Sequence, residues 1–392
     1  MFEASFDELT NADAKAFYAQ HWRDDIANLV LKSSGDDLAK ARAIQLDARK
    51  RAQQKLPSWF NNSRIVFPPK ANLEQASSEQ TAQYKASLVD FDTSIDLTGG
   101  TGIDSWQFAL RAKKHTYVEP NAALCRLTAY NFNALGQTNI EIINQKAETF
   151  IENFHASVDL IFIDPSRRVK GGRKVVLNEY EPDVLNLLEA LVNKANNVLI
   201  KVSPLADITY LIKSFSPFCT AIHVVALNNE CKEILIVARK QGASNISINT
   251  INLMDQGNHQ VFSFNQSAEA ENGIIAKAVE AYIYEPNAAI MNAGAFNSIS
   301  QAFDLKKLDK HAHVYTSTRL IPDFPGNVYS VLEVSKPYKL TGQFDHVSIT
   351  SRNFPEKPDQ IRKRLGYKDG NTFRLYATTL AGKKTFVMCK PS

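Results

Sequence analysis

The segment with the clearest capacity for chemistry is a glycine-rich bend after a short hydrophobic run. It reads Ser94-Ile-Asp-Leu-Thr-Gly-Gly-Thr-Gly-Ile-Asp104, and a helical stretch, Ser105–Ala112, follows it. Glycines at such a bend let the backbone approach a ligand closely, because no Cβ stands in the way. A dinucleotide site expects G-x-G-x-x-G, but Ser105 occupies the place of the third glycine. The Asp96 carboxylate directly before the bend favours a ligand with positive charge over a pyrophosphate.

A second carboxylate, Glu119, stands at the end of the next expected strand, about 20 residues beyond the glycines. A carboxylate at that place in a nucleotide-binding α/β fold can accept hydrogen bonds from both ribose hydroxyls of an adenosine. Adenosine joined to a cationic sulfonium and an amino acid is S-adenosylmethionine. The bend and its two carboxylates therefore predict an S-adenosylmethionine site.

These residues resemble the motifs of class I methyltransferases. Asp96 through Asp104 is similar to the first motif of that family (hydrophobic-Asp-x-x-Gly-x-Gly), Glu119 to the second, and Ala147-Glu148 to the adenine-contacting position. The resemblance implies that the first motif shapes the methionine end of the pocket and that Glu119 holds the ribose. The cofactor-binding residues that it implies are Asp96, Thr98, Gly99, Gly100, Thr101, Gly102, Asp104, Glu119, Asn121, Ala147, Glu148 and Asp164.

The fourth expected strand ends in Asp164-Pro-Ser-Arg-Arg168. In open parallel sheets the ligand site lies beyond the carboxyl ends of the strands, so this segment should lie beside the glycine bend. Methyltransferases that act on planar amino groups have Asp/Asn-Pro-Pro-aromatic here. The resemblance implies that the Asp164 side chain and the Pro165 carbonyl position the acceptor nitrogen, with Ser166 and Arg167 completing the catalytic set. Ser166 and Arg167 depart from the family pattern.

Asp-Pro-x-Arg also resembles the corresponding edge of several RNA methyltransferases, including those that methylate carbon 5 of uracil. Those enzymes need a cysteine just after the fifth strand, and Ile200–Ala206 contains none. An exocyclic or ring nitrogen is therefore the favoured acceptor, unless Cys219 or Cys231 folds back. The Arg167 and Arg168 guanidinium groups either stack on a base or grip a phosphate, or they pair with Glu179 or Glu181.

Two further resemblances concern the flanks of this core. Gln75–Ala82 resembles the element before the first motif in trimethylguanosine synthase-like RNA methyltransferases, and it also fits a simple helix cap. The whole chain resembles a bacterial methyltransferase family with a ferredoxin-like and a THUMP-like C-terminal module, at positions such as Tyr284-Glu285-Pro286-Asn287 and Pro322-Asp323. THUMP modules are associated with RNA binding, so the resemblance implies an RNA partner.

The charge distribution agrees with a polyanionic partner. Leu320–Ser392 contains 12 Lys/Arg and 6 Asp/Glu, a net charge of +6, whereas the whole chain carries +4. Arg362-Lys363-Arg364 lies near Tyr367, and basic side chains neutralise phosphates while an aromatic ring can stack on a base. These three residues are the candidate RNA contacts of the tail, and the alternative is a solvated helix face.

The order of the expected elements predicts an α/β protein. The first ~60 residues should be helical, since Ala41, Ile44, Ala48, Ala52 and Leu56 recur at helical spacing before Pro57. From residue 92 to 240, strands alternate with helices, and Ala221–Leu227 and Glu233–Ala238 are close enough for an antiparallel hairpin.

We expect a seven-stranded, mostly parallel Rossmann-like methyltransferase sheet that ends in this hairpin, with small α+β modules after it. A helix is expected near Ile274–Tyr284, and strands at Asp345–Thr350, Thr372–Thr379 and Thr385–Cys389 with a helix at Pro358–Gly366. The expected domains are an N-terminal helical region (1–70), the methyltransferase domain (71–240), a ferredoxin-like module (241–319) and a basic THUMP-like module (320–392).

Composition excludes several classes of protein. The 392 residues are 44% hydrophobic and 22% charged, as in globular proteins with two to four domains. No apolar run approaches the roughly 20 residues that span a bilayer, and the start carries acids where an export signal would carry Lys or Arg. The four scattered cysteines argue against a zinc site or disulfides, so we expect no metal, no membrane association and a cytoplasmic location.

The sequence therefore predicts an S-adenosylmethionine-dependent methyltransferase that acts on structured RNA. One alternative is a methyltransferase for a small molecule or a protein. Another is an RNA-binding protein whose methyltransferase core is catalytically silent, an alternative that the unusual Ser166-Arg167 edge keeps open. The RNA, the accepting atom and the oligomeric state are left open.

Overall fold

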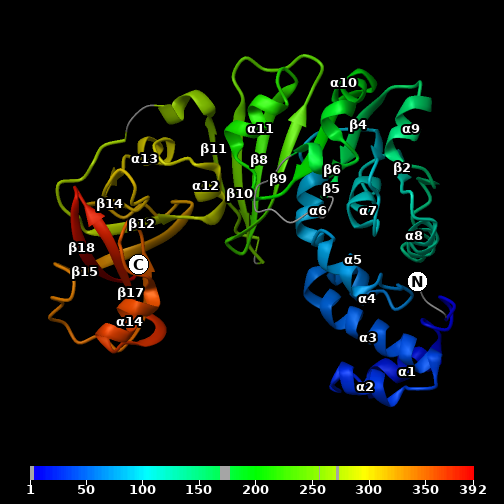
Figure 1. The fold of residues 1–392 in the computed structure, drawn as a ribbon, viewed down its shortest axis with the longest axis horizontal. Coiled ribbons are helices and arrows are strands. Elements are labelled where there is room, and N and C mark those ends of the chain that lie inside the picture. Colours follow the sequence, from blue (N-terminus) through cyan, green and yellow to red (C-terminus); the bar gives the residue numbers. More distant parts are fainter. Residues whose placement is uncertain (1–3, 168–176, 256, 271–272) are drawn as a thin grey trace. The chain divides into compact units, whose positions relative to one another are not determined.

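The computed structural model describes residues 4–167, 177–255, 257–270 and 273–392 (Figure 1). The chain divides into two compact units. The first consists of Met1–Cys219 and Leu235–Gly242, and the second of Thr220–Ile234 and Ala243–Ser392.

The first unit begins with helices, as predicted. They are α1 (Ala12–Gln20), α2 (Ile26–Lys32), α3 (Asp37–Lys55), α4 (Pro57–Asn61) and α5 (Lys70–Gln75). An acidic or amide side chain before each of α1, α2 and α3 accepts a hydrogen bond from a first-turn N–H group, which satisfies a donor that the helix itself cannot pair. Ala41, Ala48 and Ala52 lie on the buried face of α3 as expected, but Ile44 is 37% exposed, so its assignment to that face was wrong. Helical spacing alone does not fix the edge of an apolar face.

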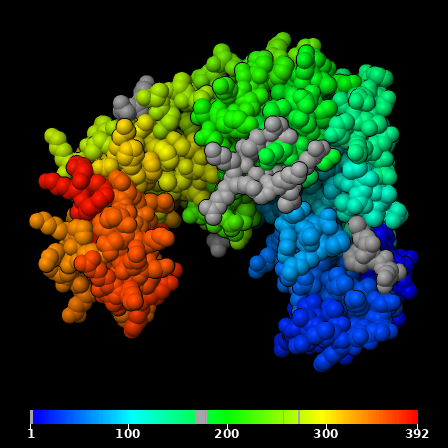
Figure 2. Space-filling view, viewed as in Figure 1, coloured from blue at the N-terminus to red at the C-terminus, as the bar shows by residue number. Residues whose placement is uncertain are grey.

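These helices share a hydrophobic core with the part of the chain that follows. Trp59 of α4 and Phe67 pack in one cluster with Trp106, Tyr117 and Phe132. In Figure 2 the blue atoms of the N-terminal helices adjoin the lighter blue and cyan atoms of the segments that follow them in the first unit. The N-terminal helices therefore share a core with α7, the helix that follows the glycine bend.

One sheet has nine strands in the order β11-β10-β8-β9-β7-β4-β1-β2-β3. Its strands are β1 (Thr93–Asp96), β2 (Lys114–Val118), β3 (Ile140–Ile143), β4 (Val158–Ile163), β7 (Ala195–Val202), β8 (Cys219–Leu227), β9 (Glu230–Ala238), β10 (Ser247–Leu253) and β11 (Gln260–Asn265). The helix α6 (Glu79–Ala86) precedes β1, and the helices between the strands are α7 (Ile103–Ala109), α8 (Ala122–Ala134), α9 (Ala147–Asn153), α10 (Val184–Lys194) and α11 (Ile208–Ser214).

The predicted methyltransferase fold is confirmed. The pairs β1–β2, β1–β4, β2–β3 and β4–β7 are parallel, and β8 and β9 form the expected hairpin. Asn228 and Asn229 form its two-residue turn with φ of 49° and 64°, values that asparagine tolerates better than most residues. The strands β10 and β11 extend the sheet beyond the predicted seven, since β10 pairs with β8.

The second unit contains a further sheet, in the order β13-β14-β12-β15-β18-β17-β16. Its strands are β12 (Tyr282–Pro286), β13 (Lys306–Lys307), β14 (Tyr315–Ser317), β15 (Gly326–Ser335), β16 (His346–Ser351), β17 (Lys368–Leu380) and β18 (Lys383–Pro391), with helices α12 (Ala288–Ala293), α13 (Ser298–Ala302) and α14 (Pro358–Leu365). The three strands and the helix predicted after residue 340 are confirmed. The helix predicted near Ile274–Tyr284 is wrong, because Tyr282–Pro286 forms the strand β12 between β14 and β15. Among the described residues, no helix combines the length and apolarity needed to cross a membrane.

Candidate functional site

A cavity of about 400 Å³ lies at the carboxyl ends of β1, β2 and β4, within the first unit. Most of the predicted site residues lie on its wall: Thr98, Gly99, Gly100, Thr101, Asp104, Glu119, Ala147, Glu148, Asp164 and Ser166. Asp96, Gly102, Asn121 and Pro165 are not among the residues that line the cavity. The side chain of Arg167 and all of Arg168 fall outside the described part of the chain. The fold thus brings together segments that are up to about 70 residues apart in the sequence, as parallel sheets do at this edge.

The glycine bend is held in place by its own backbone and by Tyr117. The Gly99 N–H donates to the Val118 carbonyl at 2.9 Å, and the Tyr117 hydroxyl donates to the Gly100 carbonyl at 2.7 Å. A Cβ on Gly99 would lie 2.2 Å from the Tyr117 ring, so no larger residue fits there. Gly102 has φ of +80°, and a Cβ there would meet Thr128. Close packing and backbone conformation together require glycine at these two positions.

Asp96 supports the bend from below. Its side chain is 1% exposed, and its carboxylate accepts hydrogen bonds from the Thr98 N–H at 2.9 Å and the Ser105 hydroxyl at 2.6 Å. Burial raises the pKa of Asp96 to about 7, against the lowering effect of these two hydrogen bonds, and the nearby carboxylates of Asp104 and Asp164 raise it further. Asp96 therefore organises the bend, and its carboxylate does not line the cavity.

Glu119 connects the bend to the start of α8. Its two carboxylate oxygens accept from the Gly100 N–H at 3.0 Å and the Asn121 N–H at 2.8 Å. The Asn121 side chain in turn caps α8. A carboxylate oxygen has two lone-pair sites, so each oxygen of Glu119 can accept one more hydrogen bond from a ligand in the cavity.

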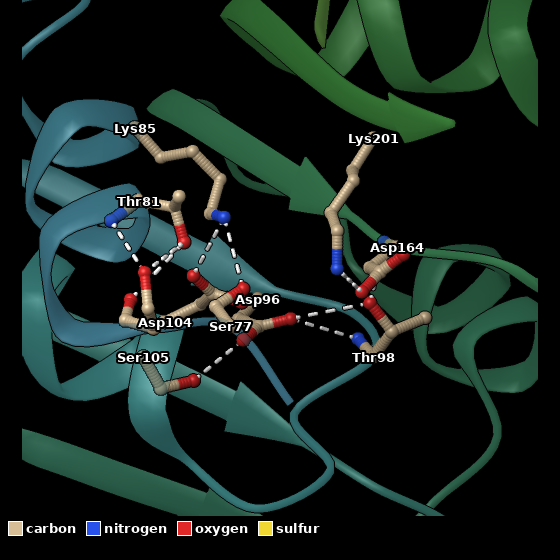
Figure 3. A network of polar contacts seen from close by, with 10 residues as sticks. Ser77, Thr81, Lys85, Asp96, Thr98, Asp104, Ser105, Asp164 and Lys201 are labelled. Carbon is tan, nitrogen blue, oxygen red and sulfur yellow. Dashed lines mark hydrogen bonds and ion pairs between the residues drawn. The ribbon is translucent and has the colours of Figure 1, made fainter. Parts of the chain in front are cut away.

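A buried lysine, which the sequence analysis missed, holds the opposite side of the bend (Figure 3). The Lys85 ammonium on α6 lies 3.1 Å from the Asp104 carboxylate and 2.9 Å from the Ser77 hydroxyl, which itself donates to Asp104 at 2.7 Å. The predicted cap of α6 is confirmed, with Ser78 as the capping residue. Lys85 gave no sequence signal, because a lysine in a polar helix is normally exposed.

A second lysine, Lys201, contacts Asp164, the first residue of the segment predicted to bind the methyl acceptor. Its ammonium lies 2.6 Å from the Asp164 carboxylate, and the Asp164 N–H donates to the Thr98 hydroxyl at 2.7 Å (Figure 3). Lys201 lies one residue before the end of β7, in the Ile200–Ala206 stretch that contains no cysteine. Ser166 lies in the two-residue strand β5 (Ser166–Arg167), which pairs with β6 (Tyr180–Glu181).

The cavity wall is strongly acidic. Among its described residues are five carboxylates and one lysine, Lys146; the acids are Asp104, Glu119, Glu148, Asp164 and Glu181. Lys85 and Lys201 pair with Asp104 and Asp164, and Glu119 and Glu148 still outnumber Lys146 on the wall. Such a wall attracts a cationic ligand and repels a pyrophosphate.

None of the four cysteines lines this cavity. Cys125, Cys219 and Cys389 are buried, and burial raises the pKa of both the Cys219 and Cys231 thiols to about 11. A thiol with a raised pKa is a poor nucleophile, because the thiolate is the reactive form. Within the described residues, no group of three or more His, Cys, Asp or Glu side chains is arranged to hold a metal ion.

The basic residues predicted to contact RNA lie on α14 in the second unit. The Arg362 guanidinium donates to the Val347 carbonyl at 3.1 Å and to Asp369 at 2.6 Å. Arg364 lies over the Tyr338 ring at 3.8 Å. Lys363 is exposed and has no such interaction within the described part of the chain. Two of the three residues thus have structural partners, and Lys363 is the most accessible to a ligand.

Comparisons with known proteins agree with this fold. Two domain models match the C-terminal part of the chain: a ferredoxin-like domain at residues 282–325 and a THUMP domain-like model at residues 326–391. A comparison with curated protein sequences returns no match. Among solved structures, a Porphyromonas gingivalis W83 protein described as a "putative methyltransferase" is 27% identical with a TM-score of 0.86, and all of both chains is covered.

Two shorter structures match in part. A Streptococcus mutans protein described as a "putative methyltransferase", in complex with SAH, is 13% identical, and an rRNA methylase from Streptococcus thermophilus is 16% identical. Each has a TM-score of 0.31 and covers 41% of this chain and 94% of its own. The full-length likeness establishes the shared fold. The predicted resemblance to a methyltransferase with ferredoxin-like and THUMP-like modules is confirmed.

Proposed function

We propose that this protein transfers a methyl group from S-adenosylmethionine to a nitrogen atom of a nucleotide in structured RNA. The observation that carries the proposal is the acidic cavity at the glycine bend, where Glu119 keeps acceptor sites for a ligand. The full-length likeness to a protein described as a methyltransferase supports the reaction class.

The residues of the cavity fit S-adenosylmethionine in size, charge and hydrogen bonding. A volume of about 400 Å³ lies within the range of about 300–1,000 Å³ that small-molecule pockets have. The excess of carboxylates suits a sulfonium and an ammonium group. Glu119 would hold the ribose hydroxyls, Gly99 and Gly100 would pass close to the methionine part, and Ala147 and Glu148 would flank the adenine.

When bound, S-adenosylmethionine supplies an electrophilic methyl group. The Asp164 carboxylate and the Pro165 carbonyl would accept hydrogen bonds from the two N–H groups of an acceptor amine and so direct its lone pair toward the cavity. The Lys201 ammonium pairs with the Asp164 carboxylate and so holds that side chain in place. A nitrogen acceptor fits better than carbon 5 of a pyrimidine, because no cysteine lines the cavity.

Two features of the second unit support RNA as the substrate. The THUMP domain-like model matches residues 326–391, and the segment from Leu320 to Ser392 carries a net charge of +6. Lys363 offers an exposed ammonium for a phosphate. Arg167 and Arg168 of the first unit are proposed to add contacts to the RNA.

The test is transfer of a labelled methyl group to total RNA, with mass spectrometry of modified nucleosides from cells with and without the gene. The Asp164→Ala variant should bind S-adenosylmethionine nearly as well as the native protein and lose turnover, since Asp164 acts on the acceptor. The exposed Asp13→Ala variant on α1 should change neither property. Equal loss of both properties in Asp164→Ala would refute the role of Asp164.

The same assay separates the alternatives. Binding of RNA and of S-adenosylmethionine without methyl transfer would indicate a catalytically silent core. The departure of Ser166 and Arg167 from the family pattern is the observation that favours this alternative. Transfer to a protein or small-molecule fraction but not to RNA would contradict the RNA substrate and leave the reaction class intact.

A further inference from the structure

A second cavity, of about 710 Å³, lies entirely within the second unit. The strand β12, the end of β16 and the strand β17 supply its charged residues, Glu285, Arg352 and Arg374, and apolar side chains such as Met291 and Ile349 line another part of its wall. Glu285 belongs to the Tyr284–Asn287 segment, which the proposed methyl transfer does not use.

The charged residues form one network around a buried carboxylate. The Glu285 side chain is 9% exposed, and it accepts from Arg352 Nη2 at 3.2 Å, from Arg374 Nη2 at 3.0 Å and from the buried Tyr376 hydroxyl at 2.9 Å. Burial of a carboxylate is costly unless it is paired, and one arginine would balance its charge. The second arginine leaves a net positive charge beside the cavity.

Arg352 is the group that can offer this charge to a ligand. Its side chain is 37% exposed, and it makes one side-chain hydrogen bond within the described residues, through Nη2 to Glu285. Its Nη1 group is left as a donor. Arg374 is held more firmly, because Nη1 also donates to the Ser348 hydroxyl at 3.0 Å. The network therefore orients a guanidinium group without using all of its donors.

The chemistry of this cavity matches a phosphorylated nucleotide. Guanidinium groups bind phosphate oxygens with two parallel hydrogen bonds, so an oriented arginine is suited to a phosphate. A volume of about 710 Å³ is far larger than a phosphate alone requires and lies in the usual range for organic ligands. The Met291 and Ile349 side chains offer an apolar surface on which a base can pack.

We propose that this cavity binds the phosphate monoester of one nucleotide, with Arg352 on the phosphate and Glu285 as the residue that positions Arg352. The nucleotide is either free or the phosphorylated end of an RNA chain, since both present the same group. This inference does not depend on methyl transfer, because it concerns a different cavity.

The test measures binding of uridine 5′-monophosphate to the full chain by calorimetry, because uridine does not match the adenosine proposed for the first cavity. Uridine and inorganic phosphate should each bind at least tenfold more weakly than the nucleotide. Arg352→Gln should weaken nucleotide binding at least tenfold, whereas Arg319→Gln, which removes an exposed arginine of the same unit that lies off the cavity wall, should not change it. Glu119→Ala in the first cavity should leave nucleotide binding intact.

Several results would overturn the proposal. These are absence of nucleotide binding at millimolar concentration, equal binding of uridine, equal binding of phosphate, or equal effects of Arg352→Gln and Arg319→Gln. Arg352→Gln leaves Glu285 paired with Arg374 and Tyr376, so the variant should fold, and an unchanged melting temperature checks this. Competition with a 5′-phosphorylated oligoribonucleotide then identifies the source of the nucleotide. If the phosphorylated oligoribonucleotide competes and its unphosphorylated form does not, the site binds RNA ends. If neither competes, the site binds free nucleotides.

Discussion

The Lys85 ammonium lies 3.1 Å from the Asp104 carboxylate, with the lysine side chain fully buried. This pair joins α6 to the first turn of α7, directly beside the glycine bend. A buried ion pair is weak evidence of added stability, but removal of one partner leaves a buried charge without compensation. The ion pair between Lys85 and Asp104 thus fixes the position of α6 relative to the cavity wall.

Lys85→Met should lower the free energy of unfolding by about 3–5 kcal/mol, because Asp104 would lose its partner in a largely buried place. Urea denaturation measures this change. The additional substitution Asp104→Asn should restore part of the loss, since it removes the unpaired charge. Lys15→Met on the exposed face of α1 is the matched control and should change stability by less than about 0.5 kcal/mol. Equal effects of the two lysine substitutions would contradict this account.

Glu119→Ala should weaken S-adenosylmethionine binding by about 1–3 kcal/mol, since the ligand loses charge-assisted hydrogen bonds and the bend loses an anchor at Gly100. Glu119→Gln should not restore binding fully. Both carboxylate oxygens accept from backbone N–H groups, so an amide would place its NH₂ group against one of those donors. Calorimetry checks both variants against Glu141→Ala on β3. If Glu119→Ala binds S-adenosylmethionine with unchanged affinity, Glu119 does not contribute to the binding site.

Asp96→Asn should change how stability depends on pH. The pKa of Asp96 in the folded protein is about 7, above the value near 3.8 of an unperturbed aspartate. Between these values the folded state holds a proton that the unfolded state has lost, so the contribution of Asp96 to stability decreases as pH rises through this window. Asparagine does not titrate. As the pH rises from 5 to 8, the free energy of unfolding of the variant should therefore increase relative to that of the native protein by about 2–4 kcal/mol.

Denaturation at several pH values measures the difference between the two proteins. Burial lowers the pKa of His115 to about 3 and of His223 to about 4, from an ordinary value of 6.5, so toward pH 5 the unfolded protein binds protons at these histidines that the folded protein does not. Their contribution is common to both proteins and cancels in the difference. A difference that stays constant from pH 5 to pH 8 would mean that Asp96 is already ionised in the folded state.

Lys363→Glu should weaken RNA binding and lower its salt dependence, because a phosphate contact releases about one counterion. Binding of total RNA at several salt concentrations shows the slope, with Lys15→Glu as the control. This variant is a cleaner test than deletion of residues 320–392. β15 pairs with both β12 and β18, so the deletion would strip strands from the sheet that the ferredoxin-like part shares. A salt slope equal to that of the native protein would exclude Lys363 from the RNA contact.

Local signals explain why so much of the first cavity could be predicted. The glycine bend, Glu119 and the Asp164 edge each follow a strand, and parallel strands bring such positions to one edge of a sheet. Lys85 and Lys201 could not be found in this way, because their roles depend on partners 19 and 37 positions away, respectively. Asp96 was placed correctly along the chain, but only the tertiary structure shows that its carboxylate faces the underside of the bend.

The second unit was harder to predict. The run Ile274–Tyr284 has apolar residues that fit either a helix or a strand, and pairing with β14 and β15 decides the outcome in favour of a strand at its end. The network around Glu285 joins residues 67 to 91 positions apart, and no motif links them. Long-range pairing of this kind leaves no periodic signal in a single sequence.

Two hydrogen bonds meet at the residue Thr98: its backbone N–H group donates to the Asp96 carboxylate, and its hydroxyl accepts from the Asp164 N–H. One small residue therefore sets the spacing between the tips of β1 and β4. Because Thr98 links these two strand ends, we expect that a redesign for another substrate would have to change the proposed donor-binding and acceptor-binding parts of the cavity together.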